Sequence, residues 1–273
     1  MRALGRPLVY VGALVAVVLF AGPFVFMVLS SFKQPQELNG VVNGFLPQSL
    51  YTGNYENLFA TGNFPLYFVN SAVVALLTTV LALVVAILAG YALARFPFTG
   101  RRLLLLAVVA MQMFPAVLMA IPLYKILRNL GMLDARSGLI LVYVTFALPF
   151  CIWMMRNYFV TVPKEIEEAA LIDGCGHFRA LWRVLLPPAL PGVTAAGAFS
   201  IILAWDEFLY ANTFVNSDEK RTLSVGLDSL VGQYTTDWGQ LLAGGVLMTL
   251  PVVLIFAFLQ RYLTQIAGGG VKG

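Results

Sequence analysis

Residues 66–95 read LYFVNSAVVALLTTVLALVVAILAGYALAR, and Arg95 is the only charged residue in this run of 30. A helix needs about 20 mostly apolar residues to cross the hydrocarbon core of a membrane, so the stretch predicts a spanning helix. Five other stretches reach a similar apolar length. The six predicted spans are Leu8–Ser30, Leu66–Arg95, Leu103–Ile126, Leu139–Tyr158, Leu190–Val215 and Leu241–Tyr262.

The composition excludes an ordinary water-soluble globule, because 60% of the 273 residues are hydrophobic and only 11% are charged. Membrane β-strands would alternate apolar and polar residues over about 10 positions, whereas Leu, Val and Ala run continuously here. The predicted fold class is therefore an all-α integral membrane protein, with six transmembrane helices in a single domain over residues 1–273.

The basic residues predict how the chain is oriented. Arg2 and Arg6 precede the first apolar stretch, as in a signal peptide, but Leu8–Ser30 is longer than the usual apolar core of about 7 to 15 residues. We therefore expect a retained span. Placing the N-terminus in the cytoplasm puts 11 of the 17 Lys and Arg residues in inner segments and the other 6 in outer ones. Both termini are predicted to be cytoplasmic.

The longest predicted inner segment, residues 157–191, contains the polar stretch EEAALIDGCG at 167–176. Pro163 suits the start of a helix and Gly174 suits its end, which predicts a helix over Lys164–Asp173. Helical spacing places an apolar and small-residue face beside the carboxylates of this helix, and such a face suits docking of a partner. The predicted face is formed by Ile166, Ala169, Ala170 and Asp173.

A second short helix is predicted over His177–Leu186, and Pro187 then redirects the chain. Its apolar side would lie at the membrane surface, with arginines reaching water. That apolar side is predicted to comprise Phe178, Leu181, Trp182 and Leu185. An alternative interpretation of the whole segment is a surface anchor between two spans that binds no partner.

The spacing within this segment resembles a known family. Glu168-Ala-Ala is followed by three residues, Gly174, nine residues, Val184, one residue and Leu186-Pro187. This resembles the EAA loop of ABC importer permeases, with Val184 in place of isoleucine. Two further motifs are similar to the second membrane subunit of maltose-type carbohydrate importers. They are Trp205-Asp-Glu-Phe-Leu209, with Asp206 for the usual asparagine, and the glycine-rich end Ala267–Gly273.

The resemblance implies a type I ABC importer permease (MetI-like) fold and a set of partners. The chain would work with a homologous permease subunit, two ATPase subunits and an extracytoplasmic solute-binding protein, in the cytoplasmic (inner) membrane of a bacterium or archaeon. The outer segments Ser31–Pro65 and Ser217–Gly239 are candidate contacts for the binding protein. The residues implied in ATPase coupling are Glu168, Ala169, Ala170, Asp173, Gly174, Leu186 and Pro187.

ATP chemistry is expected to lie outside this chain. The sequence contains no G-x-x-x-x-G-K-[ST] phosphate loop, so ATP and Mg²⁺ would be bound by the partner ATPase, and the chain itself is predicted to be no enzyme. His177 is the only histidine and lacks Cys or carboxylate partners at metal-ligand spacing, which disfavours a metal site. No basic stripe with interleaved aromatic residues predicts nucleic-acid binding.

Polar residues inside the predicted spans are candidates for the translocation path. A charge deep in a bilayer costs roughly 2.5 to 3.5 kcal/mol on insertion scales and normally faces the bundle interior or a watery cavity. A structural role at the outer interface is the alternative for the acids, and helix-to-helix hydrogen bonding for the neutral residues. The candidates are Asn70, Tyr143, Trp205, Asp206 and Glu207, with Gln112 and Thr145 as further polar residues.

The predicted function is a membrane-spanning permease subunit that forms half of the path for a sugar or related polyhydroxylated solute. A permease for another solute, such as glycerol phosphate, remains open. A secondary transporter driven by an ion gradient would be expected to show more spans or internal repeats. A membrane enzyme would require a catalytic cluster near the interface, and the scattered acids with one histidine form none.

Overall fold

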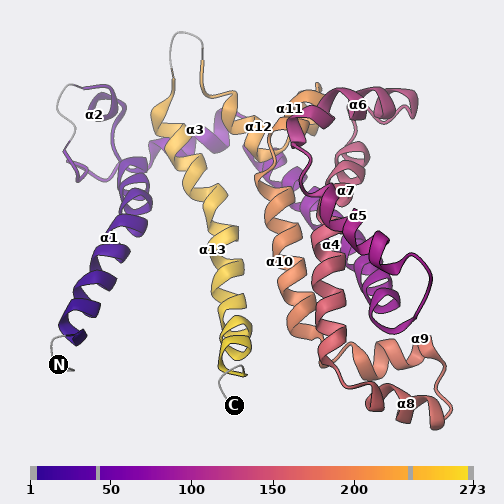
Figure 1. The fold of residues 1–273 in the computed structure, drawn as a ribbon. Helices are drawn as coiled ribbons and strands as arrows, with labels where there is room; N and C mark the ends of the chain where they lie inside the picture. The colour runs from indigo at the N-terminus through magenta and orange to yellow at the C-terminus, as the bar shows by residue number, and fades with distance from the viewer. Residues whose placement is uncertain (1–4, 41–43, 233–235, 270–273) are drawn as a thin grey trace. The chain divides into compact units, whose positions relative to one another are not determined.

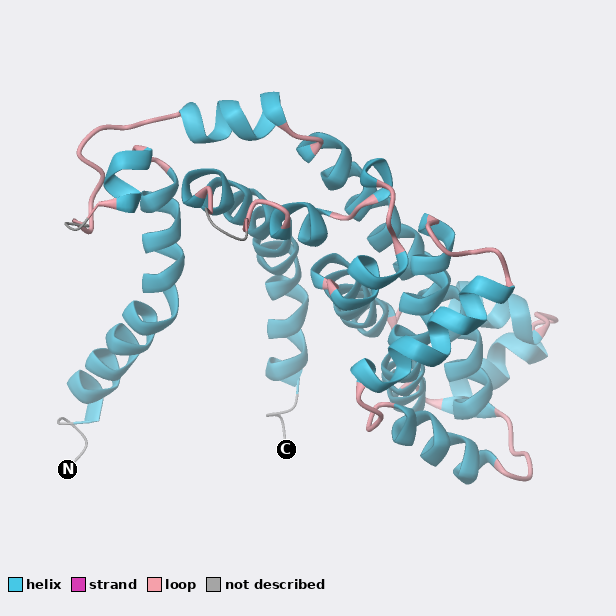
Figure 2. Ribbon diagram, turned by 90° about the horizontal axis from the view of Figure 1, so that it is seen from above, coloured by secondary structure: helices cyan, strands magenta, loops and turns pink. Residues whose placement is uncertain are grey.

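The computed structural model describes residues 5–40, 44–232 and 236–269, and every regular element in these ranges is a helix (Figures 1 and 2). A single antiparallel bridge joins Val231 and Thr236 within them. The chain separates into two compact units, whereas the sequence predicts one domain. One unit comprises Met1–Pro65 and Gly226–Pro251, and the other comprises Leu66–Val225 and Val252–Gly273. The last residues of the glycine-rich end, 270–273, lie outside the described ranges.

The first unit contains α1 (Gly5–Ser31), two short helices and the start of α13 (Trp238–Gly269). The predicted outer segment Ser31–Pro65 forms α2 (Pro35–Asn39) and α3 (Gly53–Thr61). The buried Asn54 amide holds this segment together, because its Nδ2 donates to the backbone oxygens of Ser31 and Lys33 at 2.8 Å each.

The second unit is built on α4 (Phe64–Arg95), α7 (Arg136–Thr161) and α10 (Leu190–Asp206), which run side by side (Figure 1). Small residues let their backbones approach closely. A Cβ added at Gly90 of α4 would lie 2.7 Å from Cβ of Met155, and one at Gly192 of α10 would lie 2.4 Å from the Tyr158 ring. The core between these helices is correspondingly rich in alanine, with Ala82, Ala86, Ala147 and Ala196 fully or almost fully buried.

Within the described residues, four helices are long and apolar enough to cross a membrane, namely α1, α4, α7 and α13. The third predicted span is not continuous. Residues 103–126 are divided between α5 (Arg101–Met111) and α6 (Ala116–Asn129), which meet at 100°. Pro115 lies in the break, and proline lacks the N–H that a continuing helix needs and disfavours helical geometry in the residue before it.

The fifth predicted span, 190–215, is also divided. Helix α10 ends at Asp206, and the short α11 (Leu209–Phe214) follows it. The carboxylate of Glu207 accepts hydrogen bonds from the backbone N–H groups of Tyr210 and Ala211, at 2.8 and 3.1 Å. These donors are free at the start of a new helix, so Glu207 stabilises the break and the start of α11.

Candidate functional site

The connection between α7 and α10 forms one end of the second unit (Figure 1). It contains α8 (Lys164–Ile172), α9 (His177–Ala180) and the π turn η1 (Leu181–Leu185). The two helices that the sequence predicts here are therefore present. Helix α8 stops just before Gly174, whose φ of +84° lies in the left-handed region that favours glycine.

Helix α8 has one buried side and one exposed side. Glu167 and Ala170 are only 6% and 8% exposed, whereas Ile172 is 86% exposed. The other residues of the exposed side include Glu165, Glu168, Ala169 and Asp173, and Gly174 beyond them is also exposed. The prediction that Ala170 belongs to an open docking face is therefore wrong. It lies one turn from Glu167 on the side that packs inward.

Glu167 is drawn inward by a buried ion pair with Arg95, the last residue of α4. Nε of Arg95 lies 2.9 Å from Oε2 of Glu167, and the two side chains are 6% and 8% exposed. The Tyr91 hydroxyl donates to Oε1 of Glu167 at 2.5 Å. Nη2 of Arg95 also donates to the backbone oxygen of Val162 at 2.8 Å. The guanidinium therefore links the end of α4 to two other segments, the chain just after α7 and helix α8.

An aromatic cluster surrounds this ion pair. The Tyr91 ring packs edge-to-face against Phe96 and Phe159, with centroids 5.4 and 6.0 Å apart. His177, the first residue of α9, packs edge-to-face on Phe96 at 5.3 Å, and its Nδ1 lies 3.6 Å from Oε1 of Glu167. The turn after α4 is thereby joined to the start of α9.

The sequence alone does not predict this cluster. In the sequence, Arg95 bears only on membrane topology, and Glu167 appears only as part of a polar stretch. Tyr91 and Glu167 are 76 positions apart, and no spacing rule relates a span end to an inner segment. Helical periodicity does not reveal which side of α8 is buried. Alanines occupy both 169 and 170, so an alanine is buried whether or not the helix turns Glu167 inward.

The second short helix divides its apolar residues differently from the prediction. Leu181 and Leu185 are 1% and 0% exposed, whereas Phe178 and Trp182 remain 68% and 38% exposed and pack edge-to-face at 6.1 Å. The N–H of Leu186 donates to the oxygen of Leu181, five residues earlier, at 2.8 Å. A π turn holds one residue more than an α turn, so the four residues do not share one face. Leu186 packs on the core, and Pro187 is exposed.

Most of the predicted path residues make internal contacts near the N-terminal end of α4 and the C-terminal end of α10. Tyr143 is fully buried and donates to Oε2 of Glu207 at 2.6 Å. Trp205 is 6% exposed and packs edge-to-face on Phe68 at 5.3 Å. Nδ2 of the fully buried Asn70 donates to the backbone oxygens of residues 219 and 221 at 2.9 Å each, so it anchors the segment that follows α11. Asp206, by contrast, is exposed.

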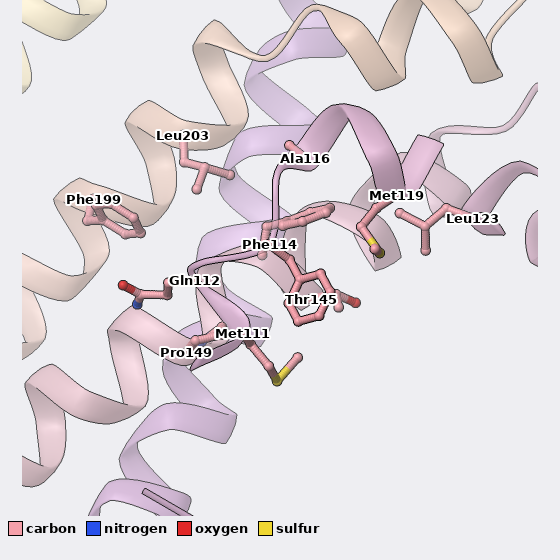
Figure 3. Close-up of a pocket in the computed structure, with 11 residues that line it drawn as sticks. Met111, Gln112, Phe114, Ala116, Met119, Leu123, Thr145, Pro149, Phe199 and Leu203 are labelled. Atoms are coloured by element: carbon pink, nitrogen blue, oxygen red, sulfur yellow. The ribbon is translucent and has the colours of Figure 1, made fainter. Parts of the chain in front are cut away.

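The second unit also contains a pocket of about 550 Å³ at the bend between α5 and α6 (Figure 3). Its wall is mainly apolar, and Gln112 and Thr145 supply polar side chains. Both were candidates from the sequence, whereas none of the five main path candidates lines it. Phe199 and Leu203 form the α10 wall of the pocket, and Asp206 follows them on the same helical face at spacings of seven and three.

Comparison with known proteins adds to this geometry. Residues 82–266 match the model of the family described as "Binding-protein-dependent transport system inner membrane component". The chain belongs to this family. It is therefore a permease subunit of an ABC importer, and the ATPase is a separate component of such systems.

Two relatives resemble the permease over nearly their whole length. The sulfoquinovosyl glycerol transport system permease protein SmoH of Agrobacterium fabrum is 36% identical over 270 residues, covering 98% of this chain and 95% of SmoH. The trehalose/maltose transport system permease protein MalG of Thermococcus litoralis is 30% identical over 279 residues, covering 100% of this chain and 99% of MalG.

The permease also shares its fold with a solved structure. One chain of a bacterial ABC transporter involved in the import of the acidic polysaccharide alginate superposes with a TM-score of 0.83. The alignment covers 96% of this chain and 98% of that one, at 24% identity. The likeness shows that the permease has the ABC importer fold. The family match includes the whole α7–α10 connection and the pocket.

Proposed function

We propose that the permease forms half of the path for a sugar or related polyhydroxylated solute, and that α8 docks onto a separate ATPase subunit. The observation that carries the docking assignment is the exposed side of α8. Ile172 is 86% exposed there, next to the carboxylates of Glu168 and Asp173, while Glu167 fixes the other side of the helix. An apolar side chain surrounded by charged residues suits a protein interface, which combines an apolar centre with a polar rim.

The individual residues would divide the work of docking. Ile172 and Ala169 would enter the partner's cleft, since an alanine lets the two surfaces come close. Glu168 and Asp173 would pair with basic groups at the rim of that cleft. Gly174 would end the helix and release the chain toward α9. Ala170, Leu186 and Pro187 would instead hold the connection in shape, because Ala170 is buried and Leu186 packs on the core.

The assembly would contain a homologous permease, two ATPase subunits and a solute-binding protein. The outer segments Ser31–Pro65 and Ser217–Gly239 would contact the binding protein. The first of them is organised by the buried Asn54, which supports its role as a shaped surface. We place both termini and the α7–α10 connection in the cytoplasm, because 11 of 17 basic residues then lie on the inner side.

The solute class is supported by the relatives and by the pocket. SmoH and MalG are named for glycoside and disaccharide transport. In this chain the pocket at the α5–α6 bend would form one wall of the path, where Gln112 and Thr145 offer hydrogen bonds to hydroxyl groups. Asp206 would stand beside it, toward the end of α10, as an exposed carboxylate on the same helical face.

The proposal is tested by purifying the permease with its partner permease, ATPase and binding protein, and reconstituting the complex in lipid vesicles. A panel of sugars, with glycerol phosphate among the other solutes, is presented on the binding protein. We expect at least one sugar to stimulate ATP hydrolysis and to accumulate inside. Uptake that continues without ATP but stops when the ion gradient is removed would contradict the proposal.

A further inference from the structure

We infer that Arg95, Glu167 and Tyr91 form a joint that transmits movement of α8 to α4. The inference rests on the proposed docking of α8, and it assigns positioning roles to three residues that the docking face does not contain. One contact carries the inference: the Arg95 side chain, at the end of α4, is buried against the Glu167 carboxylate. Glu167 lies on the opposite side of α8 from the exposed Ile172.

Without this ion pair, α8 would be attached mainly to its neighbours in sequence. Helix α8 packs against α9 and η1, which lead directly into α10. A force on α8 would then pass mainly along the chain, to α7 on one side and to α10 on the other. The contacts of Arg95 with Glu167 and with the oxygen of Val162 connect α8 also to α4 and to the end of α7. The three core helices of the unit would therefore move together.

The energetics also favour a positioning role over simple stabilisation. A buried ion pair adds little net stability, because removing both charges from water offsets their attraction. Such pairs fix registry where geometry matters. The rings of Phe96 and Phe159 pack on the Tyr91 ring, and the Tyr91 hydroxyl holds the second carboxylate oxygen of Glu167. The carboxylate of Glu167 is thus held in one orientation relative to α4.

The test compares Glu167→Gln with Arg102→Gln in the complete reconstituted complex. Arg102 is an exposed charged residue near the start of α5, outside the docking face, and serves as the control for loss of one charge. Two quantities are measured: the affinity of the ATPase for the permease, and the number of solute molecules imported per ATP hydrolysed. We expect Glu167→Gln to keep ATPase affinity within about twofold and to lower import per ATP by about tenfold, in the range of mutations that disrupt coupling between sites. Arg102→Gln should leave import per ATP unchanged.

Exchanging the charges provides the rescue. The double variant Arg95→Glu with Glu167→Arg restores an ion pair in the reverse sense and should recover much of the lost import per ATP. If Glu167→Gln does not assemble, Tyr91→Phe keeps the ion pair and removes only the hydroxyl donor. It should lower import per ATP by about two- to threefold.

Two results would overturn the inference. One is unchanged import per ATP in both Glu167→Gln and Tyr91→Phe. The other is that Glu167→Gln loses ATPase binding, while the complexes that still form import as much solute per ATP as wild type. The ion pair would then only support the docking face locally. Failure of the proposed docking itself would show earlier, as a wild-type complex in which no ATPase contacts α8.

Discussion

Replacing Ile172 with alanine is the sharpest test of the docking face. The side chain is 86% exposed, so the subunit alone gains little stability from it. In the assembled importer we expect it to be buried in a cleft of the ATPase. The substitution removes three carbon atoms while keeping the helix, because alanine is the best helix former.

The size of the effect follows from the burial that docking would add. Each buried methylene-sized group contributes about 0.8 kcal/mol, so the three carbons are worth roughly 2 kcal/mol. That corresponds to about a 30-fold weaker Kd for the ATPase. The free energy of unfolding of the isolated permease should stay within about 0.5 kcal/mol of wild type, as for other surface substitutions.

The matched control is Ile121→Ala on α6, where the isoleucine is 71% exposed at the other end of the second unit. Binding of labelled ATPase is titrated against permease in lipid nanodiscs, and unfolding of each permease variant is followed separately by thermal denaturation. Ile121→Ala should bind the ATPase as wild type does. Equal affinities for wild type and Ile172→Ala would refute the assignment of this face.

Three further changes test the end of α8 and the contacts around α11. Gly174→Ala places a residue with a Cβ at φ +84°, which should destabilise the permease by about 1–2 kcal/mol. Among the described residues, no atom beyond the chain neighbours lies within 4 Å of that Cβ, so a lower Tm would report backbone strain alone. An unchanged Tm would contradict this strain. Tyr143→Phe removes the hydrogen bond to Glu207 and should destabilise the permease by about 1.5–3 kcal/mol, measured in the same way, whereas a variant as stable as wild type would show that the bond is dispensable. The pKa of Asp134 is held well below its usual range by hydrogen bonds from the hydroxyl and N–H of Ser217 and from the Lys220 ammonium. The Asp134 carboxylate therefore stabilises the fold above about pH 4, and this stabilisation is lost as pH falls through the lower folded pKa. The stability difference between wild type and Asp134→Asn should therefore shrink in denaturation measurements below about pH 4, and a difference independent of pH would exclude this role.

Local signals in the sequence predicted the elements well. The continuous helices α1, α4, α7 and α13 follow from apolar length, whereas the breaks in the third and fifth predicted spans do not. Helix α8 follows from Pro163 at its start and Gly174 at its end, since both signals act within one helical turn. The spaced motif beginning at Glu168 predicted the family, which the family comparison confirmed.

Features that depend on tertiary contacts could not be predicted from the sequence. A nine-residue helix with small residues on two sides does not reveal which side is buried, and the ion pair of Glu167 with Arg95 decided this for α8. The sequence analysis predicted one span over residues 103–126, and apolar length did not reveal the 100° bend near Pro115 or the pocket beside it. Glu207 was predicted in the translocation path, and its bonds to the start of α11 depend on a helix break that apolar length alone does not show.

The side chain at position 169 gives the most direct test of the central claim that α8 meets the ATPase on the cytoplasmic side. Ala169→Cys is introduced with Cys175→Ser, which leaves the buried Cys151 as the other thiol. Inside-out membrane vesicles are treated with a membrane-impermeant maleimide, with and without bound ATPase. We predict rapid labelling of position 169 in the permease alone and strong protection in the assembled complex. Equal labelling in both, or labelling only from the outer side, would contradict the account.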